Sequence, residues 1–167
     1  MTPLQIAFFA LFAVFAIAGA ISDFRTRKIR NVLNLAFFAV GVVMVMVTVG
    51  WSEGVWYLAH FAAAFALGIA IFAIGGWGGG DAKFYAAMAV WFPISQFLNL
   101  LISFALVGGV MALLYFATRR SRGENVLGGD KKSREIPYGV ALAIGGLLVQ
   151  VWAVQALLDP ATQLRAF

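Results

Sequence analysis

The chain has 167 residues, of which 63% are hydrophobic and only 11% are charged, and its mean hydropathy is +0.93. Soluble domains have roughly 45–50% apolar and about 25% charged residues, so this composition predicts an integral membrane protein and excludes a soluble globular one. The sequence contains no cysteine and one histidine, His60, which excludes disulfides, thiolate metal sites, cysteine nucleophiles and a multi-histidine metal centre. The net charge of +5 comes from basic residues in loops beside apolar segments, which indicates membrane topology and contact with the lipid bilayer rather than with nucleic acid.

The first apolar segment, residues 3–21, ends in Ala18, Gly19 and Ala20, which resemble a signal-peptidase site. A cleavable signal peptide carries its positive charges before the apolar stretch. Here no positive charge precedes the segment, and basic residues follow it closely, beginning at Arg25. We therefore expect a retained first transmembrane helix with its N-terminus outside.

Further along the chain the apolar segments continue, and six are expected in all: residues 3–21, 32–50, 55–74, 82–92, 95–117 and 138–158. About 20 helical residues cross the roughly 30 Å hydrocarbon layer, and five of the six segments are close to that length. The fourth is short and is stopped by Pro93, so a re-entrant segment is the alternative to a crossing one. The sequence predicts a single all-α domain over residues 1–167, a bundle of six transmembrane helices.

The distribution of positive charge distinguishes these two arrangements. If all six segments cross, eleven of the 12 Lys and Arg residues lie on one side and only Arg165 lies on the other. If the fourth segment turned back, each side would carry six. Positively charged loops stay cytoplasmic, so six crossings are predicted, with both termini outside the inner (plasma) membrane. The basic loop 118–136 then lies near cytoplasmic headgroups, and Glu53 lies on the outer side.

This topology places two carboxylates at the cytoplasmic face. Asp23 follows the first segment, and Asp81 precedes the fourth. Five of the six residues 75–80 are glycine, and such a backbone is tolerated at membrane depth only inside protein or beside a wet cavity. We expect Asp81 in the first turn of the next helix, where the helix dipole favours negative charge, with an N-cap at an ordinary turn as the alternative. The alternative for Asp23 is an ion pair with nearby arginines.

Two carboxylates that share one site cannot both ionise easily, so one of them retains a proton. Such a pair can hold a water molecule. One aspartate then acts as base toward the water, while the protonated one polarises a carbonyl. Aspartic peptide hydrolysis needs no metal, cofactor, thiol or histidine, which agrees with the composition.

Other polar residues have simpler interpretations. Gly128-Gly129-Asp130 is similar to the Asp81 region, but Leu127 replaces the first glycine and two lysines follow, so Asp130 is interpreted as a solvated loop charge, as are Glu124 and Glu135. His60 lies deep in the third segment, where a hydrogen-bonded packing role is expected and a proton relay is the alternative.

Three stretches together resemble the type IV prepilin peptidase family of membrane aspartic proteases, the Gly-x-Gly-Asp class. They are Asp23 with the basic residues and Asn31 that follow it, the stretch from Gly78 to Lys83, and the stretch from Ile136 to Ala141. The resemblance implies catalytic roles for Asp23 and Asp81, and a prepilin as protein substrate. It also implies that further residues shape the site or contact the substrate, namely Gly78, Gly80, Lys83, Asn31, Pro137, Tyr138 and Gly139.

The sequence departs from that family at two points. Arg30 stands where members commonly have proline before the asparagine, and a cysteine-containing cytoplasmic region of the large bacterial members is missing. The resemblance therefore points to the small peptidase-only branch, similar to enzymes that process Flp-like pilins of tight-adherence pili, a kind of type IV pilus. The leader would be cleaved at the cytoplasmic face.

Two other functional classes compete with this interpretation. One is a Mg²⁺-dependent membrane phosphotransferase, whose sites typically need more clustered acids than two. The other is a small channel or transporter in which Asp23, Asp81 and His60 form an ion path.

Overall fold

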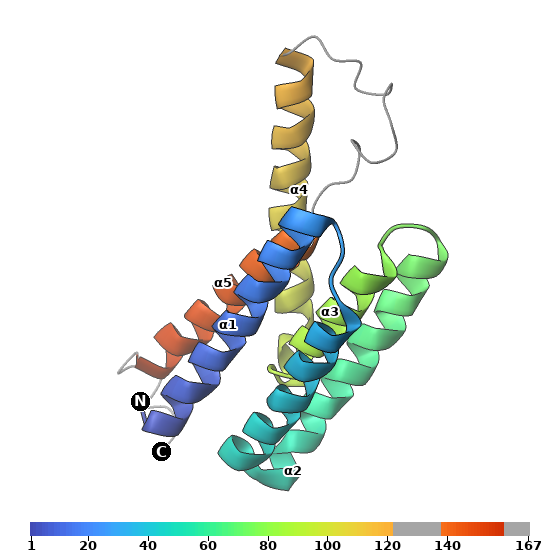
Figure 1. Ribbon diagram of the computed structural model, residues 1–167. Coiled ribbons are helices and arrows are strands. Elements are labelled where there is room, and N and C mark those ends of the chain that lie inside the picture. Colours follow the sequence, from blue (N-terminus) through green and yellow to red (C-terminus); the bar gives the residue numbers. More distant parts are fainter. Residues whose placement is uncertain (122–137, 159–167) are drawn as a thin grey trace.

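The computed structural model describes residues 1–121 and 138–158 (Figure 1). Within these ranges the chain is helical and contains no strand. The elements are α1 (Pro3–Thr26), α2 (Asn31–Ala73), α3 (Gly79–Ala89), the short 3₁₀ helix η1 (Ile94–Gln96), α4 (Phe97–Ser121) and α5 (Tyr138–Leu158). The prediction of an all-α fold is confirmed.

The long helix α2 consists of two arms. Gly50, near the middle of its 43 residues, has φ +79° and ψ 178°, a conformation that glycine adopts without strain. The chain reverses there, and residues 31–49 and 51–73 form two arms that run in opposite directions (Figure 1). The rings of Phe38 and Phe61 join the arms, with centroids 4.4 Å apart. The arms correspond to the second and third predicted segments.

Four helices in the described part of the chain are long and apolar enough to cross a membrane: α1, α2, the helical stretch Ile94–Thr118 and α5. The chain is therefore a multi-pass membrane protein. The count of six crossings stays a prediction, since α2 is one helix with a break and α3 has only 11 residues. A helix of that length rises about 16 Å, roughly half of the hydrocarbon layer.

Helix α3 is short because it lies inside the bundle rather than in lipid. Seven of its residues are buried, from Ala82 to Ala89 with only Lys83 exposed among them. It packs against both arms of α2 and also contacts α5 and α1. The aromatic core lies around its C-terminal end, where Trp91 Nε1 donates a hydrogen bond to the carbonyl of Phe37 at 3.2 Å. Helix α3 begins three residues before the predicted segment, 82–92, because Gly79 and Gly80 are already helical. It also ends three residues before that segment does.

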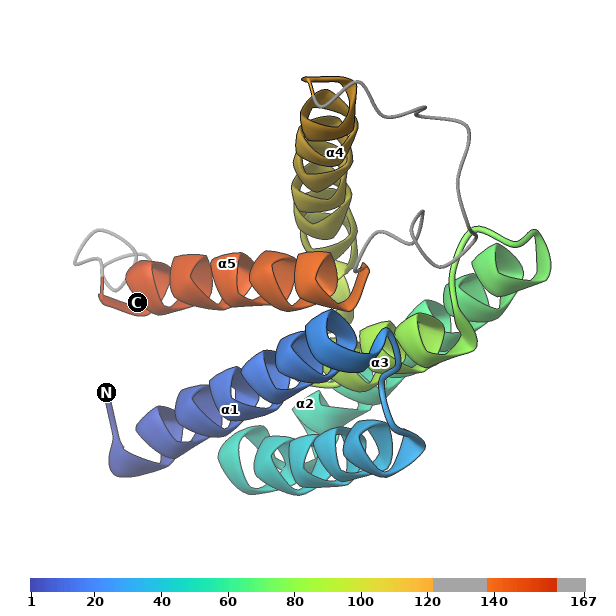
Figure 2. The ribbon, with the colours of Figure 1, turned by 45° about the horizontal axis from the view of Figure 1, so that its top comes forward.

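The helices alternate in direction, so their ends gather in two groups. In Figure 1 the C-terminal end of α1 and the N-terminal ends of α3 and α5 are the upper ends of those helices, a loop descends from α1 to the start of α2 near mid-height, and the chain's N-terminus lies at the lower part. Helix α4 packs against α5 through one half only, where Ser103 Oγ donates to the carbonyl of Gly145 at 3.0 Å. Its other half projects beyond the bundle in both ribbon views (Figures 1 and 2).

Candidate active site

Asp23 lies near the C-terminal end of α1, on the buried face that also carries Phe12, Ala16 and Gly19. The side chain is 5% exposed. Its Oδ2 accepts a hydrogen bond of 2.8 Å from the backbone N–H of Gly139, the second residue of α5. The first N–H groups of a helix have no partner within the helix and carry the positive end of its dipole. The start of α5 therefore holds the Asp23 carboxylate.

Residue 139 must be glycine for this contact to form. A Cβ atom added there would lie 2.8 Å from Asp23 Cβ, 2.9 Å from Asp23 Oδ2 and 2.7 Å from Ile29 Cδ1. All three distances are shorter than real Cβ contacts. Tyr138, the preceding residue, is 37% exposed, and Pro137 lies outside the described residues.

Asp81 lies in the first turn of α3, as predicted. The N-cap is Gly78, with an extended backbone of φ −72° and ψ 149°, so the alternative in which Asp81 itself caps the helix is wrong. The Asp81 carboxylate lies over this cap, because a Cβ added to Gly78 would come within 2.9 Å of Asp81 Oδ2. The negative group thus stands at the positive end of the α3 dipole.

The start of α2 holds the start of α3 through two side-chain hydrogen bonds. Asn34 Nδ2 donates to the carbonyl of Gly80 at 3.2 Å, and Lys83 Nζ donates to Asn31 Oδ1 at 3.1 Å. Asn34 is buried and was missed by the sequence analysis, although an asparagine one helical turn after Asn31 in an apolar segment was a usable signal. The two bonds fix the residues on both sides of Asp81.

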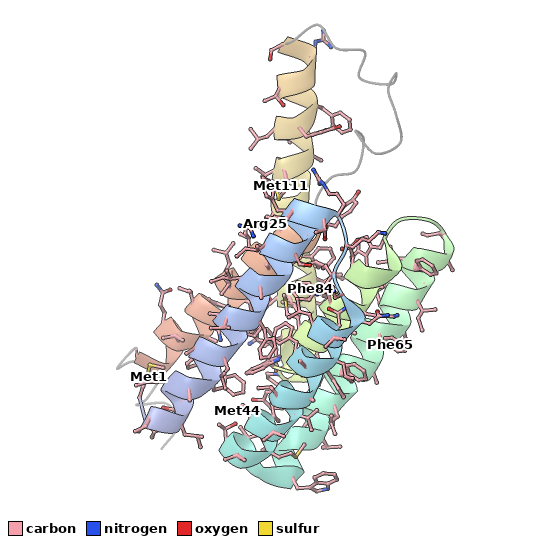
Figure 3. The ribbon with its side chains drawn as sticks, in the orientation of Figure 1. Met1, Arg25, Met44, Phe65, Phe84 and Met111 are labelled. Carbon is pink, nitrogen blue, oxygen red and sulfur yellow. The ribbon has the colours of Figure 1, made fainter. Side chains whose placement is uncertain are left out.

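Helices α1 and α3 pack in opposite directions. Gly19 of α1 contacts the ring of Phe84 of α3, and nearer the start of α1 the Phe8 ring packs on Trp91 with centroids 5.0 Å apart. Residues later in α3 and after it contact residues earlier in α1, so the two helices are antiparallel. Figure 3 shows Phe84 in the centre of the bundle and Arg25 at the far end of α1.

This register directs the two aspartates toward the same end of the α1–α3 interface. Asp23 is four residues after Gly19, and Asp81 is three residues before Phe84, so each lies about one turn beyond the Gly19–Phe84 contact. Residues three or four apart share a helix face. Both side chains therefore project toward the same end of the α1–α3 interface.

Ile29 connects the surroundings of the two aspartates. It is buried, its backbone lies where a Cβ on Gly80 would approach to 3.3 Å, and its Cδ1 lies beside Gly139. The loop that carries Ile29 is fixed to α1, because the hydroxyls of Ser22 and Thr26 both donate to the carbonyl of Lys28, at 2.8 and 3.0 Å. Ile29 was also missed by sequence reasoning, though it is an isolated apolar residue within a basic stretch.

A cavity of about 250 Å³ adjoins this region. Its walls include Trp77, the residue before Gly78, and Tyr138, the residue before Gly139. Helix α4 closes the opposite side with Phe104 and the small residue Gly108. The cavity therefore borders the chain segments that hold both aspartates.

The remaining candidates lie elsewhere. His60 is fully buried, and its Nδ1 donates to the carbonyl of Phe92 at 3.0 Å, near the opposite end of α3, which agrees with a packing role. Among the described residues no group of three His, Cys, Asp or Glu side chains is arranged to hold a metal ion. Asp130, Glu124 and Glu135 lie outside the described residues.

Comparison with the sequence models of protein families shows which family this chain belongs to. The sequence model of the type IV leader peptidase family matches residues 10–115, more than half of the chain. The chain belongs to the type IV leader peptidase family. The matched range contains Asp23, Asp81 and the α1–α3 interface, while Tyr138 and Gly139 lie beyond it. No match to a curated protein or to a solved structure was found.

Membership in the type IV leader peptidase family implies a protease in the membrane, with a prepilin as its protein substrate. It favours the peptidase over the phosphotransferase and the channel that the sequence left as alternatives.

Proposed function

We propose that this type IV leader peptidase is an aspartic endopeptidase in which Asp23 and Asp81 form the catalytic pair. The observation that carries the proposal is the register of α1 against α3, which directs both carboxylates to one end of their interface. Each carboxylate also stands at the N-terminal end of a helix, Asp23 at α5 and Asp81 at α3. Two acids in this arrangement share a proton more readily than they both ionise.

The reaction then follows from one ionised and one protonated aspartate. The ionised carboxylate takes a proton from a water molecule, whose oxygen attacks the carbonyl carbon of the scissile peptide bond. The protonated aspartate donates to the carbonyl oxygen, where negative charge develops. When the peptide C–N bond breaks, the first aspartate passes its proton to the leaving nitrogen. The second aspartate recovers a proton from a hydroxyl of the tetrahedral intermediate, which restores the starting protonation state.

The apolar helix of a precursor pilin is proposed to approach from the side of the 250 Å³ cavity. Trp77 and Tyr138 border this cavity, and both are next to glycines that contact an aspartate. The projecting half of α4 exposes Leu113 and Leu114, an apolar surface beside this cavity that is suited to packing of the precursor helix. Flp-like precursors are the proposed substrates, since the resemblance is to the small peptidase-only branch.

Cleavage is proposed at the cytoplasmic face of the inner membrane. Arg25 lies in the last turn of α1, Lys28 and Arg30 lie in the loop that follows, and Lys83 lies near the start of α3, so these basic residues belong to the end of the bundle that carries the aspartates. Positive charge of this kind is retained on the cytoplasmic side. Both chain termini are then outside.

The experiment is cleavage of a Flp-like precursor by purified protein in proteoliposomes, with Asp23→Asn and Asp81→Asn as variants. Each variant should lose at least about 10³-fold in rate, because each removes a group that transfers protons in the transition state. Glu53→Gln, which removes an exposed carboxylate elsewhere, should cleave at the wild-type rate. Full processing by either aspartate variant would refute the assignment.

A further inference from the structure

A second hollow lies on the face of α3 that points away from the aspartates. It is an open groove of about 390 Å³ between the two arms of α2 and α3. Its walls are aromatic, formed by Phe38, Phe61 and Phe65, and its floor is formed by Ala86 and Ala87. Phe65 is 39% exposed and lies on the side of the molecule away from α1 and α5 (Figure 3). The groove is therefore open toward the surrounding membrane.

One end of the groove is polar. Lys83 and Asn31 line it and are joined by their side-chain hydrogen bond. Asn34 also lines it, one helical turn further along α2, and is only 5% exposed. Asn34 Nδ2 donates a hydrogen bond to the carbonyl of Gly80, but Asn34 Oδ1 has no hydrogen-bond partner among the described residues. Buried acceptors are rarely left unpaired, and this oxygen is shielded from water in the unliganded protein, so a ligand in the groove would supply its donor by displacing the groups that cover it.

We propose that the groove binds one anionic phospholipid with a hydroxylated headgroup, of the phosphatidylglycerol type. An open apolar groove in a bilayer is filled by hydrocarbon, so an acyl chain would lie against Phe38, Phe61 and Phe65. The phosphate would pair with Lys83, and a headgroup hydroxyl would donate to Asn34 Oδ1.

The charges around the groove favour this occupant. The loop that leads into Asn31 carries Arg27, Lys28 and Arg30, and basic residues beside a membrane attract anionic lipids. The body of α3 separates the groove from Asp81, since Lys83, Ala86 and Ala87 lie on one face and Asp81 and Phe84 lie on another. A precursor peptide bound at the aspartates would have to pass around α3 to enter the groove.

The first test is native mass spectrometry of the full chain with phosphatidylglycerol and phosphatidylcholine supplied together. The wild type should bind one phosphatidylglycerol about fivefold more tightly than phosphatidylcholine, the ratio expected from one lysine near anionic lipid. Lys83→Gln should remove most of the preference. Lys28→Gln, which removes an equal charge from the basic loop outside the groove, should lower the preference far less. Equal preference in Lys83→Gln and the wild type would overturn the proposal.

The second test locates the bound molecule. A photoreactive p-benzoylphenylalanine is placed at Phe65 in the groove, or at Val43 as a control, since Val43 is 60% exposed and does not line the groove. Proteoliposomes contain phosphatidylglycerol, phosphatidylcholine and a Flp-like precursor. Selective cross-linking of phosphatidylglycerol at position 65 supports the proposal. Cross-linking of the precursor, or equal lipid labelling at both positions, contradicts it. Neither readout depends on peptidase activity, so the outcome is separate from that of the proposed function.

Discussion

The carboxylate of Asp23 has room to meet the start of α5 only because residue 139 has no side chain. The Cβ of an alanine at this position would fall within 2.9 Å of Asp23 Oδ2 and closer still to Ile29. The end of α1, the loop that follows it and the start of α5 therefore meet in this way only because residue 139 lacks a methyl group. A Cβ on Gly78 would likewise come within 2.9 Å of a catalytic candidate, at Asp81 Oδ2.

Gly78 and Gly79, two adjacent glycines before Asp81, form a matched pair of positions for substitution. Gly78→Ala would place a methyl group 2.9 Å from Asp81 Oδ2, so the carboxylate at the end of that side chain would have to shift. We expect at least a tenfold loss of cleavage rate, since small displacements of a catalytic group are costly. Gly79→Ala meets only ordinary contacts with Phe72 and is helical, so it should be tolerated. Cleavage assays at equal protein amounts compare the two, and equal activity would contradict the geometry.

Residue 139 gives a second prediction. Gly139→Ala should lower the cleavage rate at least about tenfold, because the displaced groups are the Asp23 side chain and Ile29. Gly139→Ala with Ile29→Ala removes part of the crowding and should recover part of the activity. The measurement is the initial rate of precursor cleavage; a single variant as active as the wild type would show that Asp23 does not need this contact.

Between elements, the decisive contact is that of α1 with α3 at Gly19 and Phe84. Gly19→Ala would press a methyl group into the Phe84 ring and should destabilise the bundle by about 1–3 kcal/mol, as overpacking does. Phe84→Leu should relieve that crowding, so the double variant should be more stable than the sum of the two single effects predicts. Thermal unfolding in detergent measures this non-additivity. Strict additivity would mean that the helices do not meet at these residues.

The elements differ in how far the sequence could reveal them. The break in α2 follows from Gly50 and the polar residues after it, and the first-turn position of Asp81 follows from its glycines. The bond from Gly139 to Asp23 joins residues 116 positions apart, and local patterns carry no information about such a pairing. Ile29 and Asn34 did carry local signals, as an isolated apolar residue in a basic stretch and an asparagine in an apolar segment. Their contacts could not be predicted, because the partners Gly139 and Gly80 lie far along the chain.

For the whole molecule, the topology can be tested cleanly because the chain contains no cysteine. A single cysteine at Lys28 should react with an impermeant thiol reagent only when the reagent reaches the cytoplasmic side. A single cysteine at Ser52, after the break in α2, should react only from the outside. Labelling of intact cells and of inverted vesicles distinguishes a cysteine on the cytoplasmic side from one on the outer side. The reverse labelling pattern would place the aspartates at the outer face, where they could not cleave a cytoplasmic leader.

The pairing of the two aspartates is tested most directly by joining their positions. In the cysteine-free chain, Asp23→Cys and Asp81→Cys are combined and treated with a short bifunctional thiol reagent, and cross-linked fragments are detected after proteolysis. A matched pair, Asp23→Cys with Glu53→Cys, places the second thiol beyond the break in α2, away from the aspartate end. The account predicts an intramolecular cross-link for the first pair and none for the second. If both thiols of the first pair are labelled by single reagents but never joined, the two carboxylates do not share a site and the proposed mechanism is wrong.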